Sequence, residues 1–230
     1  MGCPPVPPAR LVPHPFCPMP LFDPYAALTD EQLSLLRAYA AELARVNRTY
    51  NLVAPSTVRQ IPERHVRHSL ALAVRAFPDG ATVVDWGSGG GLPAVPLAVR
   101  FPGVRFVAVD SVGKKTEAVR LFARRLGLAN LSVWNGRAEA YAGPLPTHAV
   151  SRATAPLADL WRWFAAVRVP LPTPLPDGCW APGLVCLKGG DLADETAALT
   201  RAFPDVVVKT VGLGEVLGAA WADKALVAVT

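Results

Sequence analysis

The feature that most constrains this chain is a short apolar strand that runs through glycines directly into a helical pattern. Residues 83–92 read Val-Val-Asp-Trp-Gly-Ser-Gly-Gly-Gly-Leu. Glycine allows the left-handed backbone conformation and lets a ligand approach the chain closely. In open α/β sheets, ligands bind beyond the carboxyl ends of the strands, near the point where the strand order reverses. The segment therefore predicts an α/β sheet with a ligand-binding loop after its first strand.

The remainder of the chain repeats the same rhythm of strand and helix. We expect helices between the first six strands, most clearly at Leu92–Arg100, Lys114–Leu126, Leu157–Val167 and Asp191–Ala202. Such alternation predicts an α/β fold with a seven-stranded, mostly parallel, Rossmann-like sheet covered by helices on both faces. The seven expected strands are Thr82–Asp85, Arg105–Asp110, Leu131–Trp134, Ala149–Arg152, Leu184–Lys188, Val206–Val211 and Ala225–Val229.

The chain divides into three expected parts. Residues 1–24 contain nine prolines and almost no charge, which is typical of an extended, unfolded tail. Residues 25–78 form a small helical unit, which opens on the capping-box pattern Thr29-Asp-Glu-Gln. Residues 79–230 form the α/β domain, in which the proline-rich stretch 170–182 is an irregular loop.

The net charge of +5 is concentrated in one segment. Residues 37–75 carry seven arginines and two acids, so this stretch alone accounts for the excess. A local basic surface suits a polyanion, since each neutralised phosphate releases counterions. An arginine-rich helical face with no partner would give the same count, so the charge alone leaves both interpretations open.

Composition excludes several other classes of protein. Hydrophobic residues make up 51% and charged residues 18%, a balance that excludes global disorder. No apolar run approaches the roughly 18 residues that would cross a bilayer. The first residues do not resemble a secretory signal, and the four cysteines have no metal-ligand or disulfide spacing. We therefore expect a cytoplasmic protein without a metal site.

The glycine spacing discriminates between cofactors. The dinucleotide fingerprint G-x-G-x-x-G would require glycine at position 92, where the chain has leucine. The pattern Asp85-x-Gly87-x-Gly89-x-Gly91 is instead the loop form that cradles S-adenosylmethionine in class I methyltransferases. Asp110 ends the second expected strand, 19 residues after Gly91, where a carboxylate can accept both hydroxyls of a ribose. A helix-capping aspartate is the alternative for this position, but the two features together favour an adenosyl cofactor.

Further blocks resemble one family, the small-subunit ribosomal RNA methyltransferase G family, formerly called glucose-inhibited division protein B. The resemblance covers about residues 28 to 229, and Gly-Leu-Pro93 and Arg137-Ala138-Glu139 are its more specific parts. The matching blocks are Asn51-Leu-Val53, Arg64-His65 with Ser69-Leu70, Asp85 to Pro93, Pro96-Leu-Ala98, Asp110-Ser111 with Lys114-Lys115, Gly136 to Glu139, Ser151-Arg-Ala153 with Ala155-Pro-Leu157, and Leu187-Lys-Gly189.

The resemblance implies an enzyme that methylates N7 of a guanine in 16S ribosomal RNA with S-adenosylmethionine. It also implies a class I methyltransferase fold and a partner that is 16S ribosomal RNA or the small ribosomal subunit. The implied cofactor-binding residues are Asp85, Gly87, Gly89, Gly91, Leu92, Asp110, Ala138, Glu139 and Arg152. Arg152 is also the candidate catalytic residue, while Arg64, His65 and Lys188 are candidates for substrate binding.

The chain departs from the family's pattern at a few positions. His68 stands where the family has an acid, Ala94 replaces a glycine, and Trp86 is bulkier than the usual aliphatic residue. These departures affect the expected RNA-contacting surface more than the cofactor loop.

The chemistry of the implied reaction needs no general base, since guanine N7 has a lone pair and no proton to lose. The enzyme must orient the base and reject adenine, and an arginine that donates to guanine O6 alone leaves N7 free to attack.

Two other functions remain open: a small-molecule or protein methyltransferase on the same fold, and a non-catalytic module that binds the cofactor. A nucleotide-dependent oxidoreductase is disfavoured by Leu92. We expect a monomer.

Overall fold

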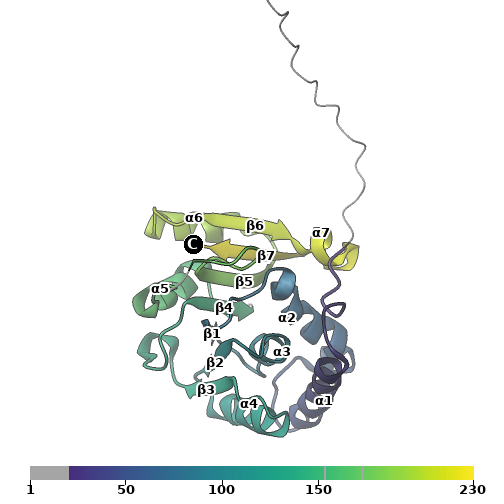
Figure 1. Cartoon of the computed structure of the whole chain (residues 1–230). Helices are drawn as coiled ribbons and strands as arrows, with labels where there is room; N and C mark the ends of the chain where they lie inside the picture. The colour runs from purple at the N-terminus through teal and green to yellow at the C-terminus, as the bar shows by residue number, and fades with distance from the viewer. Residues whose placement is uncertain (1–20, 153, 172–173) are drawn as a thin grey trace, which may run out of the picture.

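The computed structural model describes residues 21–152, 154–171 and 174–230. The expected proline-rich tail therefore lies outside the described residues up to position 20. The described part contains a seven-stranded sheet in the order β3-β2-β1-β4-β5-β7-β6, as Figure 1 shows from bottom to top. The strands are β1 Thr82–Trp86, β2 Arg105–Asp110, β3 Leu131–Asn135, β4 His148–Arg152, β5 Gly183–Gly189, β6 Val208–Gly212 and β7 Lys224–Val229.

The sheet is parallel apart from β7, which runs antiparallel to both β5 and β6. β1 pairs with β2 on one side and with β4 on the other, so the strand order reverses at β1. All five residues of β1 are buried, because helices cover both faces of the sheet there. The expected seven-stranded, mostly parallel sheet is confirmed, and it places the glycine loop at the switch point.

The helices form two layers around the sheet. One core contains residues of α1 Asp30–Asn47, α3 Ala94–Arg100, α4 Gly113–Arg125 and α7 Leu213–Leu217. A second core contains residues of α5 Leu157–Val167 and α6 Ala193–Ala202. The side chains of β1 alternate between the cores, since Val83 belongs to the first and Val84 to the second. The fold is therefore a three-layer α/β sandwich.

Helix α1 begins where the capping-box pattern predicts. The Gln32 N–H donates to Thr29 Oγ1, and the Thr29 N–H donates to Gln32 Oε1. The side-chain amide of Gln32 also donates, through Nε2, to the carbonyl of Val99 at 2.8 Å, which attaches α1 to the end of α3. Leu36, Tyr39, Leu43 and Val46 are buried along one face. The helical unit thus shares a core with the α/β domain.

The second helical segment is less regular than expected. It consists of a 3-10 stretch Pro55–Gln60, a π-helical stretch Ile61–Arg67, the short α2 His68–Leu70 and a 3-10 stretch Ala71–Val74. Pro62 has no N–H to donate, and prolines interrupt a regular ladder of helical hydrogen bonds. The side chain of Val74 is exposed, whereas Phe77, which follows the last helical turn, is buried in the first core.

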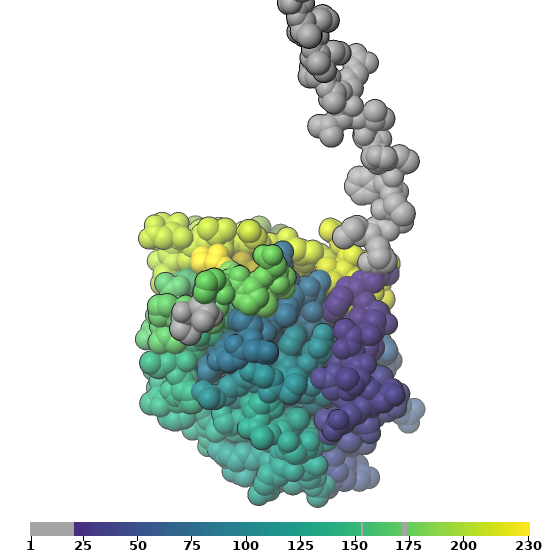
Figure 2. Space-filling model, viewed as in Figure 1, coloured from purple at the N-terminus to yellow at the C-terminus, as the bar shows by residue number. Residues whose placement is uncertain are grey.

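The start of the described chain lies against α7, near the C-terminal part of the fold. The Phe22 N–H donates to the carbonyl of Val216 in α7 at 2.8 Å, and the Phe22 side chain packs against the first core. Figure 2 shows this purple segment against the yellow C-terminal part. The packed body therefore begins before residue 25, where the sequence suggested the start of the helical unit. Among the described helices, none combines the length and the apolar character that a membrane span requires.

Candidate cofactor and substrate site

The glycine loop adopts a conformation that requires glycine. Gly87, Gly89 and Gly91 have φ angles of +72°, +56° and +90°, in the left-handed region. A Cβ atom at Gly87 would overlap the side chain of Thr154, and one at Gly91 would lie 2.6 Å from Val95 Cγ2. The loop therefore passes close to the segment that follows β4.

Asp110 holds this loop to the end of β2. Its Oδ2 accepts a hydrogen bond from the Gly89 N–H at 3.0 Å, and its Oδ1 accepts one from the Val112 N–H at 2.9 Å. Lys115 Nζ lies 4.0 Å from Oδ2. A carboxylate oxygen can accept more than one hydrogen bond, so the ring hydroxyls of an adenosine can still be bound there.

A pocket of about 310 Å³ opens beside Asp110. Four of the predicted cofactor-binding residues line it: Gly87, Asp110, Ala138 and Glu139. The lining also includes side chains that the sequence did not single out for the cofactor, among them Lys115, Thr154 and Trp163. Thr154 follows the carboxyl end of β4, so the topology could have suggested it, whereas no sequence signal identifies Trp163.

The other predicted residues of the loop do not line this pocket. Asp85 and Leu92 are buried in the protein, and the Asp85 Oδ2 accepts a hydrogen bond from the Ala94 N–H at 3.1 Å. This bond anchors the start of α3. The Asp85 Oδ1 has no hydrogen-bond partner among the described residues. Burial raises the pKa of Asp85 to about 7, against the opposing effects of the Ala94 N–H and of Arg152.

Arg152, at the end of β4, contacts the helical unit. Its Nη1 lies 3.0 Å from His65 Nδ1, and His65 Nε2 lies 2.8 Å from Thr57 Oγ1. Burial lowers the pKa of Arg152, while the neighbouring Tyr39 and Asp85 act in the opposite direction. The Tyr39 hydroxyl donates to the carbonyl of Gly90 at 2.8 Å, so this group of side chains adjoins the glycine loop.

Lys188, at the end of β5, is buried and paired. Its Nζ donates to Glu195 Oε1 at 2.7 Å and to the carbonyl of Ala155. Glu195 Oε1 also accepts a hydrogen bond from the Leu157 N–H at 3.2 Å. The pair thus fixes the segment between β4 and α5. Contact between Lys188 and an RNA phosphate stays a prediction, and it would require this pair to open.

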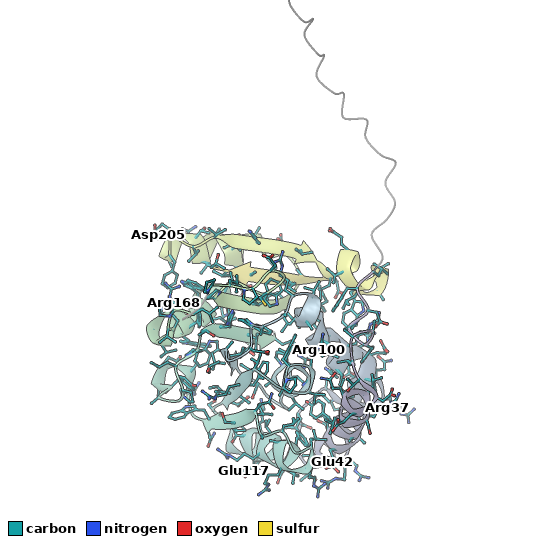
Figure 3. The ribbon with its side chains drawn as sticks, viewed as in Figure 1. Arg37, Glu42, Arg100, Glu117, Arg168 and Asp205 are labelled. Atoms are coloured by element: carbon teal, nitrogen blue, oxygen red, sulfur yellow. The ribbon has the colours of Figure 1, made fainter. Side chains whose placement is uncertain are left out.

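The basic segment presents several arginines to solvent. Arg64 is exposed, and its Nε donates to Gln60 Oε1 at 2.7 Å. Arg45 and Arg67 pair with Glu42 and Glu63, so part of the positive charge is neutralised within the helical unit. Figure 3 shows Arg37 extending from α1 away from the body. The further exposed arginines of this segment are Arg48, Arg59 and Arg75.

The glycine loop, the acid at the end of β2 and the pocket at the switch point together define an α/β protein of the class I methyltransferase fold. Two solved structures show the same fold. The fibrillarin/Nop5p complex matches with a TM-score of 0.52 at 12% identity, over 70% of this chain and 78% of that chain. MtNAS in complex with MTA and tNA matches with a TM-score of 0.50 at 16% identity, over 85% and 69%. In the described residues, no three His, Cys, Asp or Glu side chains are grouped to hold a metal ion.

Sequence comparison defines the family within this class. The family model GidB, described as rRNA small subunit methyltransferase G, matches residues 32–203. Ribosomal RNA small subunit methyltransferase G of Salinibacter ruber is 50% identical over 210 residues, which cover 90% of this chain and 97% of the relative. The Chlorobaculum tepidum protein of the same name is 39% identical over 171 residues, or 74% of each chain. The chain belongs to the rRNA small subunit methyltransferase G family.

Proposed function

We propose that this methyltransferase transfers the methyl group of S-adenosylmethionine to N7 of a guanine in 16S ribosomal RNA. The observation that carries the proposal is the pocket beside Asp110, built on a glycine loop at the switch point of a chain that belongs to this family. The acceptor is the small ribosomal subunit or its RNA. The enzyme acts in the cytoplasm, where that acceptor is found, and as a monomer.

The pocket fits the proposed cofactor. Asp110 accepts the ribose hydroxyls, and Ala138 and Glu139 line the same cavity. Gly87 and Gly89 let the backbone approach the ligand, while the buried Asp85, Gly91 and Leu92 hold the loop against the start of α3. Bound S-adenosylmethionine supplies an activated methyl group on a sulfonium. The protein's task is then alignment, which can lower a barrier by about 7–11 kcal/mol.

Arg152 is the proposed contact to the reacting groups. Arg152 ends β4, which pairs with β1 ahead of the glycine loop, and one of its five N–H groups is directed to His65. The remaining donors are available to guanine O6 or to the cofactor. A donor placed on O6 selects guanine over adenine, which has an amino group at that position. No proton has to be removed from N7, so no general base is assigned.

Exposed arginines of the helical unit form the proposed RNA-binding surface. Arg48, Arg59 and Arg64 lie on the segment that leads from α1 to His65. Such contacts bind the phosphate backbone and orient the RNA without reading its sequence. The proposal for His65 as a direct RNA contact is weakened by its two hydrogen bonds within the protein. A small-molecule methyltransferase would have no need of this surface.

Transfer of labelled methyl groups tests the proposal. Labelled S-adenosylmethionine is incubated with small ribosomal subunits that lack their own N7 methylation, and with large subunits as the control. Label in the RNA of the small subunit alone is expected. Arg48→Gln together with Arg59→Gln should raise the KM for the subunit and reduce its salt dependence. Label in protein or in large-subunit RNA would reject the proposed acceptor.

A further inference from the structure

We propose that Thr57 and His65 are positioning residues, which hold the guanidinium of Arg152 in the orientation needed for methyl transfer. This inference rests on the proposed function, because it assigns Arg152 to the reacting groups. It concerns a chain of three side chains from two distant parts of the sequence. Thr57 and His65 belong to the irregular helical segment 55–67, whereas Arg152 ends β4.

The directions of the hydrogen bonds in this chain follow from the chemistry of the groups. A guanidinium can only donate, so His65 Nδ1 must accept from Arg152 Nη1. A neutral imidazole with an accepting Nδ1 carries its proton on Nε2, which therefore donates to Thr57 Oγ1. The Thr57 hydroxyl donates in turn to the carbonyl of Ala54 at 2.9 Å. Each group is thus used in one direction, and the chain ends on the backbone.

The charge of the arginine is preserved by this arrangement. Burial lowers the pKa of His65 to about 4, with Arg152 and Arg64 acting in the same direction, so the imidazole is neutral at physiological pH. A carboxylate at the same place would hold the guanidinium equally well but would cancel its positive charge. A neutral acceptor fixes the geometry and leaves the full charge for an electron-rich ligand such as guanine O6 or the cofactor carboxylate.

The arrangement also replaces conformational freedom with a fixed direction. A free arginine side chain has about 2 kcal/mol of rotamer entropy. Thr57 restrains the imidazole by holding its Nε2, and the imidazole then restrains the guanidinium. An isolated structural histidine would need neither the arginine nor the threonine. The hydrogen bonds from Thr57 through His65 therefore act on Arg152 at the end of β4, where the proposed reaction site lies.

Two substitutions at Thr57 separate positioning from packing. Thr57→Val keeps the shape of the side chain and removes the hydroxyl, whereas Thr57→Ser keeps the hydroxyl. We expect Thr57→Val to lower kcat about tenfold, with the KM for RNA and the Kd for S-adenosylmethionine changed less than about twofold, since small misplacements of a reacting group reduce rates strongly. Thr57→Ser should retain kcat within about twofold. Thr210→Val on the exposed face of β6 is the matched control.

Loss of kcat in both Thr57 variants, or in neither, would overturn the positioning role. A nitrogen-15 NMR spectrum of labelled histidines provides a readout that does not depend on activity. His65 should show an unprotonated Nδ1 and a protonated Nε2, and Thr57→Val should shift both signals. If the wild-type protein transfers no methyl group to RNA, the proposed function fails. The spectrum still decides whether the hydrogen bonds between Thr57, His65 and Arg152 are formed. A His65 ring protonated on Nδ1, or one unaffected by Thr57→Val, would contradict it.

Discussion

Asp110 and Gly89 are joined by a hydrogen bond of 3.0 Å from the glycine N–H to the carboxylate Oδ2, across 21 residues of sequence. This bond ties the loop after β1 to the end of β2, the two places where the cofactor is proposed to bind. The same carboxylate therefore shapes the loop and faces the pocket.

The first prediction concerns this double role. Asp110→Asn removes the charge and replaces one carboxylate oxygen by an NH₂ group, which cannot accept a hydrogen bond. One of the two backbone N–H groups, of Gly89 or of Val112, then loses its acceptor. Hydrogen bonds to charged groups contribute about 1.5–3 kcal/mol each, so we expect S-adenosylmethionine affinity to fall at least tenfold. Isothermal titration calorimetry measures this affinity. Asp205→Asn, at an exposed position visible in Figure 3, should leave affinity unchanged. Unaltered binding by Asp110→Asn would remove Asp110 from the site.

A second prediction separates backbone strain from lack of space. Gly87 and Gly127 both have positive φ, but a Cβ at Gly127 would meet no atom within 4 Å. Gly127→Ala should therefore cost only about 1 kcal/mol of unfolding free energy, the order expected for a left-handed alanine. Gly87→Ala has the same strain and must also displace Thr154, which lines the pocket. Only Gly87→Ala should also weaken cofactor binding, which isothermal titration calorimetry measures. Unfolding in urea measures the stability of both variants. Equal cofactor affinity and equal stability of the two variants would show that Thr154 moves aside without cost.

The buried pair of Lys188 and Glu195 gives a third prediction. Lys188→Met leaves the Ala155 carbonyl without its side-chain donor and Glu195 with only the Leu157 N–H. It should lower the free energy of unfolding by about 2 kcal/mol, less than for a fully buried pair because Glu195 is partly exposed. Lys209→Met, at an exposed position in β6, is the control. A phosphate contact predicts a different result: an unchanged stability and a weaker dependence of RNA binding on salt.

The fourth prediction concerns the dependence of stability on pH. The pKa of His68 is lowered from 6.5 to about 3, chiefly by burial; Arg152, Lys224 and His65 act in the same direction and Asp223 opposes them. The unfolded chain therefore takes up a proton near pH 6.5 that the folded protein does not accept, so stability is full above pH 6.5 and falls toward pH 3.

His68→Phe removes this proton and keeps an aromatic ring against Trp221, which lies 5.0 Å from the imidazole between ring centroids. At pH 5 the variant should lose less stability, relative to pH 7.5, than the wild-type protein does, by about 2 kcal/mol. Unfolding in urea at both pH values measures the difference. Parallel curves for the two proteins would show that His68 titrates normally in the folded state.

Local sequence patterns predicted the sheet and the position of the glycine loop well. The seven strands lie within two residues of their expected bounds, because buried parallel strands are short apolar runs and the intervening helices have their own period. The capping box at Thr29 and the position of Asp110 are equally local signals. Membership of the methyltransferase G family followed from sequence blocks that include the glycine loop and Asp110.

Tertiary contacts were beyond this kind of prediction. Arg152 and His65 are separated by 87 residues, so neither residue indicates the other in the sequence. The pairing of Lys188 with Glu195 depends on the turn from β5 into α6, whereas the sequence shows only a lysine at the end of a strand. The irregular helix around Pro62 was not predicted, because the apolar residues of this segment have the spacing of a regular helix.

Chemical mapping of the product tests the central claim most directly. Methylation of guanine N7 places a positive charge on the purine, which makes that nucleotide sensitive to borohydride reduction and then to cleavage by aniline. Small subunits that lack N7 methylation are treated with this protein and S-adenosylmethionine, and the cleavage sites in 16S ribosomal RNA are read by primer extension. The account predicts one new cleavage at a single guanine, absent when Asp110 is replaced by asparagine. Methyl transfer to 16S ribosomal RNA without any new cleavage, or at a base other than guanine, would contradict it.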